Sequence, residues 1–225
     1  MSKKSWLVCG ILAAMMGCLT LQAKTFQEIR ADAEKGDADA QFELALYYNF
    51  GVCGPKDEET AKQWCIKAAR QGHRAAFATC LEEGYGMKKD SSKSKELLRQ
   101  AAENGDVWAQ FCFGISFIGT NENKQAVFWL RKAAEQGNSW AQLFFCLNYV
   151  GITKNKDITV NPQLGIEFCT KSAMQGNALG QMLLGSFYAR GEGVEKDLTK
   201  ATYWLRKAAE QGNEQAKAAL KQLGE

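Results

Sequence analysis

The fold is decided by a decapeptide that the chain spells twice, WLRKAAEQGN, at Trp129–Asn138 and again at Trp204–Asn213. Such a repeat is either a site used twice or one part of a structural unit that recurs. Alignment on the glycine of the decapeptide gives intervals of 36, 33, 32, 39 and 36 residues between Gly36, Gly72, Gly105, Gly137, Gly176 and Gly212. Self-similarity at this period is typical of a helical solenoid, so the decapeptide belongs to a repeated structural unit.

Residues 176–211 form the clearest unit. Its second half has apolar residues at the spacing of one helix face, at Ala201, Trp204, Leu205, Ala208 and Ala209. Glycines between the two halves predict a turn. Each unit glycine precedes an Asn or Asp that can cap the next helix, except Gly72, which precedes His73. The sequence therefore predicts antiparallel helix pairs joined by short turns.

These motifs resemble the Sel-one-like repeat (SLR) family, a relative of the tetratricopeptide repeat. Residues 176–212 follow its pattern A-x-x-x-L-G-x-x-Y, G-x-G-V-x-x-D and K-A-x-x-W-x-x-K-A-A-x-x-G, with Gly180 in place of the usual alanine. The resemblance implies an all-α fold, a right-handed α-solenoid (α/α superhelix) of antiparallel helix pairs. Five repeats are expected at residues 36–71, 72–104, 105–136, 137–175 and 176–211. Capping helices are expected within residues 24–35 (at Thr25–Lys35) and 212–225 (at Glu214–Leu223).

Three repeats depart from this pattern. The second has a shortened first helix, the third has a clipped turn, and the fourth has an enlarged turn at Gly151–Gln163. In that turn, Asn161 and Pro162 have the order of a helix cap followed by a proline at the first helical position. The irregular turns are expected on one rim of the solenoid, where an individual function can be added.

Residues 1–23 have the features of a secretory signal peptide. Lys3 and Lys4 precede an apolar run that ends before Ala23, a small residue suited to cleavage. The alternative is a lipid anchor on Cys18, because residues 15–18 resemble a poor lipobox. No later segment is apolar enough to span a bilayer. The sequence predicts export to the periplasm or the medium, with a membrane-anchored lipoprotein as the alternative.

The charge balance argues against nucleic acid as a partner. The chain has 28 basic and 25 acidic side chains, and two of the basic ones lie in the signal segment. Such a balance gives no electrostatic footprint for nucleic acid or for an anionic membrane.

The residues for catalysis are sparse, and no metal or cofactor is expected. His73 is the only histidine, which excludes the usual Cys/His metal motifs. Cysteine-rich SLR proteins are described as β-lactamase-like or penicillin-binding, so the S-x-x-K at Ser92–Lys95 is the alternative, enzymatic interpretation. Its companion motifs S-D-N and K-T-G are missing, and it opens a helix, where a solvated start is the simpler interpretation.

Six cysteines follow the signal segment, an even number that suggests disulfides in an exported chain. Cys65 and Cys80 flank Gly72 at similar distances, so two antiparallel helices would hold them at similar depth. Cys146 and Cys169 would face each other within the fourth repeat, where a bridge and ordinary buried thiols are both compatible with the sequence. Cys53 and Cys112 have no evident partner.

First helices should line the concave side of the solenoid. Several of their variable positions, usually polar in the family, are apolar here and would align into a strip: Tyr47, Trp108, Ile115, Trp140, Phe144, Leu183 and Phe187. Such a strip can hold a peptide or a partner helix. Packing between adjacent repeats explains the tryptophans equally well, whereas Phe144 and Phe187 are the residues expected to be exposed.

The resemblance and the strip together predict a protein-interaction scaffold of the bacterial envelope or the secreted fraction, without catalysis. The expected partner is a protein or peptide that binds the concave surface. The partner's identity and the oligomeric state are not encoded in any motif.

Overall fold

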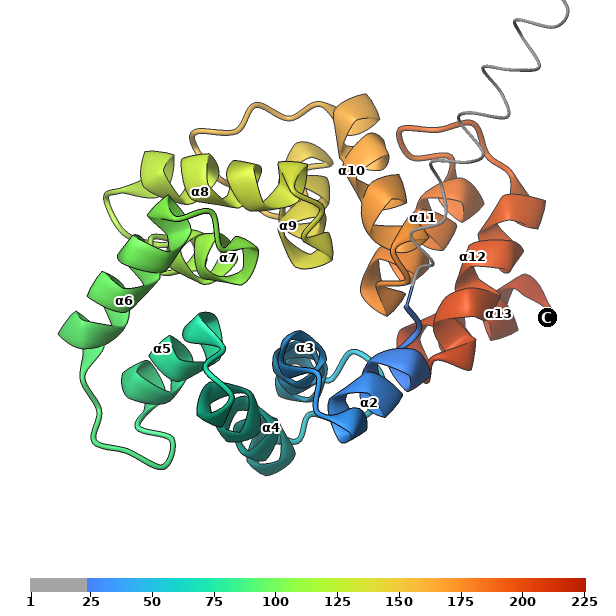
Figure 1. The fold of residues 1–225 in the computed structure, drawn as a ribbon. Coiled ribbons are helices and arrows are strands. Elements are labelled where there is room, and N and C mark those ends of the chain that lie inside the picture. Colours follow the sequence, from blue (N-terminus) through green and yellow to red (C-terminus); the bar gives the residue numbers. More distant parts are fainter. Residues whose placement is uncertain (1–23) are drawn as a thin grey trace, which may run out of the picture.

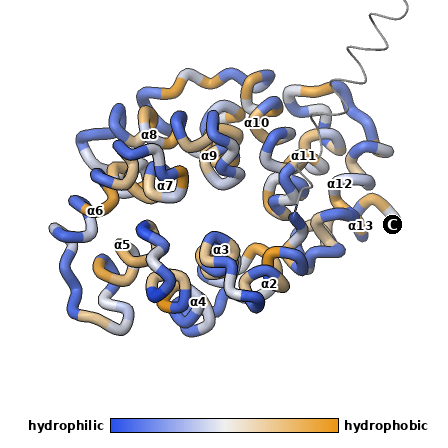
Figure 2. Tube along the Cα trace, viewed as in Figure 1, coloured by the Kyte–Doolittle hydropathy of each residue, from blue (hydrophilic) through white to orange (hydrophobic). Residues whose placement is uncertain are grey.

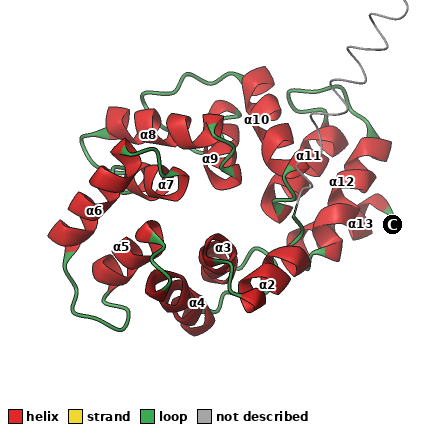
Figure 3. Cartoon of the chain, in the orientation of Figure 1, coloured by secondary structure: helices red, strands yellow, loops and turns green. Residues whose placement is uncertain are grey.

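The computed structural model describes residues 24–225, which fold into helices and loops without strands (Figures 1 and 3). The predicted signal segment, residues 1–23, and Cys18 within it lie outside the described residues. The twelve helices are α2 (Phe26–Lys35), α3 (Ala38–Phe50), α4 (Glu58–Arg70), α5 (Arg74–Glu83), α6 (Ser91–Glu103), α7 (Val107–Ile115), α8 (Asn123–Glu135), α9 (Ser139–Tyr149), α10 (Pro162–Met174), α11 (Ala178–Arg190), α12 (Leu198–Glu210) and α13 (Glu214–Leu223). The predicted α-solenoid of five helix pairs is confirmed.

The turns between repeats form as the sequence predicts. All six unit glycines have positive φ angles, between 84° and 103°, which a residue with a side chain rarely adopts. The next residue then caps the following helix, as when the Asn138 side chain accepts from the Ala141 N–H at 2.8 Å. Asn161 and Pro162 likewise act as the N-cap and first residue of α10.

His73 replaces Asn or Asp at one of these caps. Its Nδ1 accepts a hydrogen bond from the Ala76 N–H at 3.1 Å, and its Nε2 lies 3.4 Å from an oxygen of Asp39. A ring nitrogen accepts only when it carries no proton. Burial lowers the pKa of His73, although Asp39 opposes this shift. The histidine is therefore neutral in the folded chain.

Glutamine pairs connect three helices at a time in four of the five repeats. The first-helix glutamine donates to a carbonyl at the end of the preceding helix, and it accepts from a glutamine that follows the second helix. In the fifth repeat, Gln181 donates to Ala173 and accepts from Gln211 at 2.7 Å. The other pairs are Gln41–Gln71, Gln110–Gln136 and Gln142–Gln175. The decapeptide spells Gln because this amide, exposed at Gln136 and buried at Gln211, bonds to the first-helix glutamine of its repeat.

The first helices line the inside of the superhelix, and the second helices form its outside (Figure 1). Polar and apolar residues mix along the helices (Figure 2), and a one-sided apolar face is clearest in the outer helices α4, α6, α8 and α12. The superhelix turns so far that its two ends meet. The Phe26 N–H donates to Gln211 at 2.6 Å, and the Asn213 side chain donates to the Val52 carbonyl at 2.9 Å. The helices therefore form a ring in which α2 and the turn after α3 contact the residues that follow α12.

Candidate functional site

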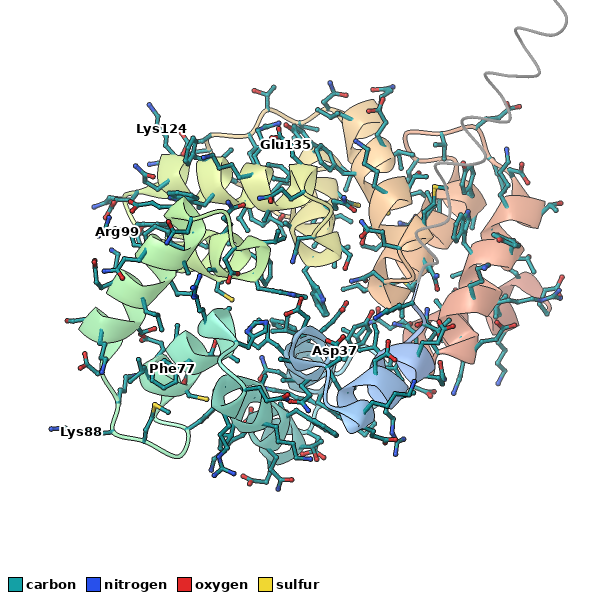
Figure 4. All side chains as sticks on the ribbon, in the orientation of Figure 1. Asp37, Phe77, Lys88, Arg99, Lys124 and Glu135 are labelled. Atoms are coloured by element: carbon teal, nitrogen blue, oxygen red, sulfur yellow. The ribbon has the colours of Figure 1, made fainter. Side chains whose placement is uncertain are left out.

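The centre of the ring is filled by its own aromatic side chains. Trp140 on α9 packs against two residues of α3, with ring centroids 5.4 Å from Tyr47 and 5.5 Å from Phe50. Trp108 on α7 packs against Phe42, also on α3, at 5.3 Å. Side chains thus project into the ring from opposite sides (Figure 4). These contacts fill part of the concave surface across the middle of the ring.

The predicted strip is therefore divided. Tyr47 and Phe187 are 2% and 1% exposed, and Trp140 is 6% exposed. Trp108, Phe144 and Leu183 are half-buried, and Ile115 is exposed. The structure brings together Ile115, Trp140 and Phe144 at one cavity, whereas Trp108 lines a different one. Leu183 lies among partly buried residues packed on the core.

The expectation that Phe187 is exposed is wrong. Phe187 follows the buried Leu184 by three residues, so both lie on the face that packs into the core. Tyr47 follows the buried Leu44 by the same interval, and it is buried for the same reason. Counted from the unit glycine, Phe144 lies one position before the equivalent of Leu184, and Leu147 one position before the equivalent of Phe187. This shift turns both side chains toward the cavity.

Two cavities open where the first helices end, and together they form what we call the apolar groove. One has a volume of about 550 Å³ and is lined by α7, α9, the end of α3 with the turn that follows it, and the start of α13. The second, of about 510 Å³, lies toward α5 and α6. Both contain Phe50, Phe111 and Ile115 in their walls. Phe50 is 59% exposed and Ile115 is 40% exposed, so large apolar side chains are open to solvent here.

Sequence reasoning missed Phe50, the most exposed of the large apolar residues in the groove. Phe50 directly precedes the turn glycine of the first repeat, where the fifth repeat has Arg190 before its own turn glycine. The sequence did contain a signal for this exposed residue: Phe50 is aromatic at a position where the clearest repeat has the charged Arg190. Phe111 and Leu143 were also missed, because their positions belong to the core in a straight solenoid.

A polar cavity of about 310 Å³ opens on the opposite face of the ring, beside the turns that join one repeat to the next. Its lining includes Asp39, Glu43 and Trp108. Burial raises the pKa of the Glu43 carboxyl to about 7, and the adjacent Trp140 indole and Lys24 ammonium offset only part of the shift. A carboxyl with this pKa is only partly ionised near neutral pH. The two faces of the ring therefore differ: the cavities on one are apolar, and the cavity on the other is polar.

The paired cysteines lie close together, as their spacing predicts. The Sγ atoms of Cys65 and Cys80 are 3.8 Å apart, and the neighbouring Cys146 thiol raises the pKa of Cys169. All six cysteines of the described chain are free thiols in the structure. Disulfide formation therefore stays a prediction for both pairs.

The S-x-x-K segment lies at the start of α6. Ser92 is exposed, and the ammonium of Lys95 lies over the ring of Phe117, 4.8 Å from its centroid. Lys95 is thus held by an aromatic ring rather than by the serine hydroxyl. Within residues 24–225, no cluster of three His, Cys, Asp or Glu residues is suited to holding a metal ion. No helix in that range is long and apolar enough to cross a bilayer.

Known proteins share this architecture. A Sel1 repeat protein from Oxalobacter formigenes is 32% identical, with a TM-score of 0.60 over 88% of this chain and 58% of its own. A protective antigen of uropathogenic Escherichia coli strains, displaying an SLR fold, is 30% identical, with a TM-score of 0.58 over 88% of this chain and 43% of its own.

A curated relative is an ERAD-associated E3 ubiquitin-protein ligase component, HRD3B of Arabidopsis thaliana. It is 31% identical over 44% of this chain and 16% of its own length. The chain therefore spans less than two thirds of each of these three proteins.

The family described as Sel1 repeat matches five successive segments, at residues 38–73, 74–106, 111–138, 146–177 and 178–213. These segments cover most of the chain and contain the pairs Gln41–Gln71 and Gln181–Gln211, whereas Gln110 and Gln142 lie just outside them. The chain is a member of the Sel1 repeat family.

Proposed function

We propose that this protein is a non-catalytic protein-binding module that holds a partner in the apolar groove. The observation that carries the proposal is the pair of connected cavities around Phe50 and Ile115, because contiguous exposed apolar surface commonly marks an interaction site. The ligase-component relative, a constituent of a protein assembly by its name, supports the same class of function. The proposed site is thus smaller than the predicted concave strip and is confined to the apolar groove on one face of the ring.

The test compares two aspartate substitutions at exposed aromatic residues. Phe50→Asp places a charge in the groove, whereas Tyr203→Asp changes a residue on the outer helix α12 that is 53% exposed. Residues 24–225 serve as bait in an envelope extract, and circular dichroism verifies that both variants fold. We expect a partner that wild type and Tyr203→Asp retain and that Phe50→Asp loses at least about tenfold. Equal retention by all three baits would exclude the groove as the site.

We also propose that the protein is exported, on the strength of the signal-like segment at residues 1–23. Recovery from the periplasm or medium with Lys24 as the first residue would support cleavage. Retention in the membrane that Cys18→Ala abolishes would instead support the lipid anchor.

In an exported chain, an oxidised thiol–disulfide oxidoreductase can accept the two electrons and two protons of each cysteine pair. Mass spectrometry would then find Cys65 bonded to Cys80 and Cys146 bonded to Cys169.

A further inference from the structure

The hydroxyl groups that line the apolar groove already have hydrogen-bond partners within the protein. The Thr79 hydroxyl donates to the Ala75 carbonyl at 2.9 Å, and the Ser94 hydroxyl donates to the Ala78 carbonyl at 2.7 Å. The Ser116 and Ser91 hydroxyls donate to the Phe113 carbonyl and the Glu82 carboxylate. Each of these side chains turns its polar atom back toward its own helix or its neighbour.

The amide side chain of Asn213, at the other end of the groove, also has hydrogen-bond partners within the protein. Asn213 donates to the Val52 carbonyl at 2.9 Å and accepts from the Ala216 N–H at 2.8 Å. Gln215, at the exposed start of α13, is the remaining amide side chain of the lining. The floor of the groove therefore presents carbon atoms almost throughout, and apart from Gln215 the remaining polar side chains at its edge are charged.

This chemistry restricts the backbone of an occupant. An extended peptide carries one N–H and one C=O per residue, and burying these groups without partners is costly. Extended peptides accordingly bind where a sheet edge or polar side chains supply hydrogen bonds. An α-helix satisfies its backbone groups internally and presents only side chains. The groove therefore suits a helix better than an extended segment.

Charges at the edge restrict the side chains of the occupant. Three carboxylates line the groove, Glu82, Glu83 and Glu214, against a single basic residue, Lys95. The Lys95 ammonium lies over Phe117, while Lys217 neutralises part of the Glu214 charge at 2.8 Å. The edge near α5 is thus acidic and favours basic residues beside the apolar face of the partner.

We infer that the occupant of the apolar groove is an amphipathic α-helix with bulky apolar residues on one face and Lys or Arg beside them. This inference rests on the proposed function, since it names the partner class of the same groove. It is separable from that function, because a groove that bound extended peptides would still be a protein-binding site.

The test is a display selection with random peptides of about 16 residues, roughly four helical turns. The wild-type chain is the target, and peptides that also bind Phe50→Asp are removed. We expect the enriched peptides to carry apolar residues at i, i+3, i+4 and i+7, with a net positive charge. Two adjacent central prolines should weaken binding at least about tenfold, because they break the helix.

The charge requirement is tested with one enriched peptide and two variant proteins. Glu82→Gln with Glu83→Gln should weaken binding about threefold at low salt, and the difference should shrink as salt rises. Tyr203→Asp should bind like wild type.

Each result of the selection has a definite meaning. Groove-dependent peptides with alternating or proline-rich patterns would overturn the helix inference and leave the proposed function intact. Neutral or acidic peptides of helical pattern would overturn only the requirement for basic residues. Removal of every enriched peptide at the Phe50→Asp step would contradict the proposed function itself.

Discussion

In the fifth repeat, Gln181 and Gln211 form a buried hydrogen-bonded pair, whereas the second repeat has Phe77 and Asn104 at the equivalent positions. The pair in the fifth repeat joins the ends of α10, α11 and α12. Phe77, labelled on α5 in Figure 4, cannot make these bonds. The second repeat instead depends on apolar packing and on the adjacent thiols of α4 and α5.

This difference separates two ways of stacking helical repeats. A buried amide pair fixes the register of three helices, because shifting one of them would leave buried polar atoms without partners. Apolar contacts are less directional and tolerate small shifts. Polar pairs therefore specify the geometry of four repeats, and the second repeat is the segment in which the geometry is least specified.

Removing the glutamine of the decapeptide should have the largest effect. Gln211→Ala loses the bonds to Gln181 and to the Gly176 carbonyl, and it removes the acceptor of the Phe26 N–H. We expect the free energy of unfolding to fall by about 3 kcal/mol, since several buried groups lose partners. Asn104→Ala, the matched change in the second repeat, should cost less than about 0.5 kcal/mol. Equal losses in urea denaturation would remove the distinction between the repeats.

A smaller loss of stability is expected from adding a methyl group at Gly185, where α11 and α12 are in close contact. A Cβ atom on Gly185 would lie 2.7 Å from Leu205 Cγ and 3.0 Å from the Ala201 carbonyl oxygen. Overpacking costs about 1–3 kcal/mol, and the better helix propensity of alanine returns roughly 1 kcal/mol. Gly185→Ala should therefore lower the free energy of unfolding by up to about 2 kcal/mol.

The second repeat has Leu81 at the position equivalent to Gly185, so its helix pair accommodates a large side chain there. A double-mutant cycle checks the contact in the fifth repeat. In a Leu205→Val background, Gly185→Ala should cost less than it does in the wild-type chain. An unchanged cost would mean that the two residues do not limit the approach of α11 and α12.

The smallest effect concerns the cap of the second repeat. His73→Ala removes the acceptor of the Ala76 N–H and should cost about 1 kcal/mol, whereas His73→Asn should preserve the cap. Because folding lowers the pKa of His73, the unfolded chain binds the proton more readily. This contribution to stability is present above the unfolded pKa, about 6.5, and is lost as pH falls below it.

The pH dependence is measured as the difference between wild type and His73→Asn. Glu43 titrates in the same range in both proteins, with the opposite sign, so its contribution cancels in the difference. We expect wild type to lose stability relative to His73→Asn between about pH 7 and pH 5. Parallel profiles would contradict the role of Nδ1 as the cap.

The repeats and their capped turns could be predicted from the sequence because both are local. Gly176 and Asn177 specify a turn whatever surrounds them. The glutamine pairs also had a local signal, since Gln181 and Gln211 recur at fixed offsets from the unit glycines, but their meaning depended on three helices meeting. The burial of Phe187 was mispredicted because one position on a helix rotates a side chain by about 100°.

The closure of the ring could not be predicted from any single repeat. It depends on small rotations that accumulate from one repeat to the next. The irregular second, third and fourth repeats set these rotations, and no local pattern gives their values. The groove followed from the same closure, because Phe50 is on α3 and its neighbours Phe111 and Ile115 are on α7.

The contact between the two ends has a consequence for how such a chain can change. An open solenoid grows by duplication, since each new unit needs only a neighbour to stack on. Here Phe26 bonds to Gln211 and Val52 bonds to Asn213, so the end of the last repeat must lie next to α2 and the first turn. One unit more or fewer would carry the chain past that place or stop it short. Both hydrogen bonds therefore depend on the number of units between them, and inserting or deleting one unit should break them.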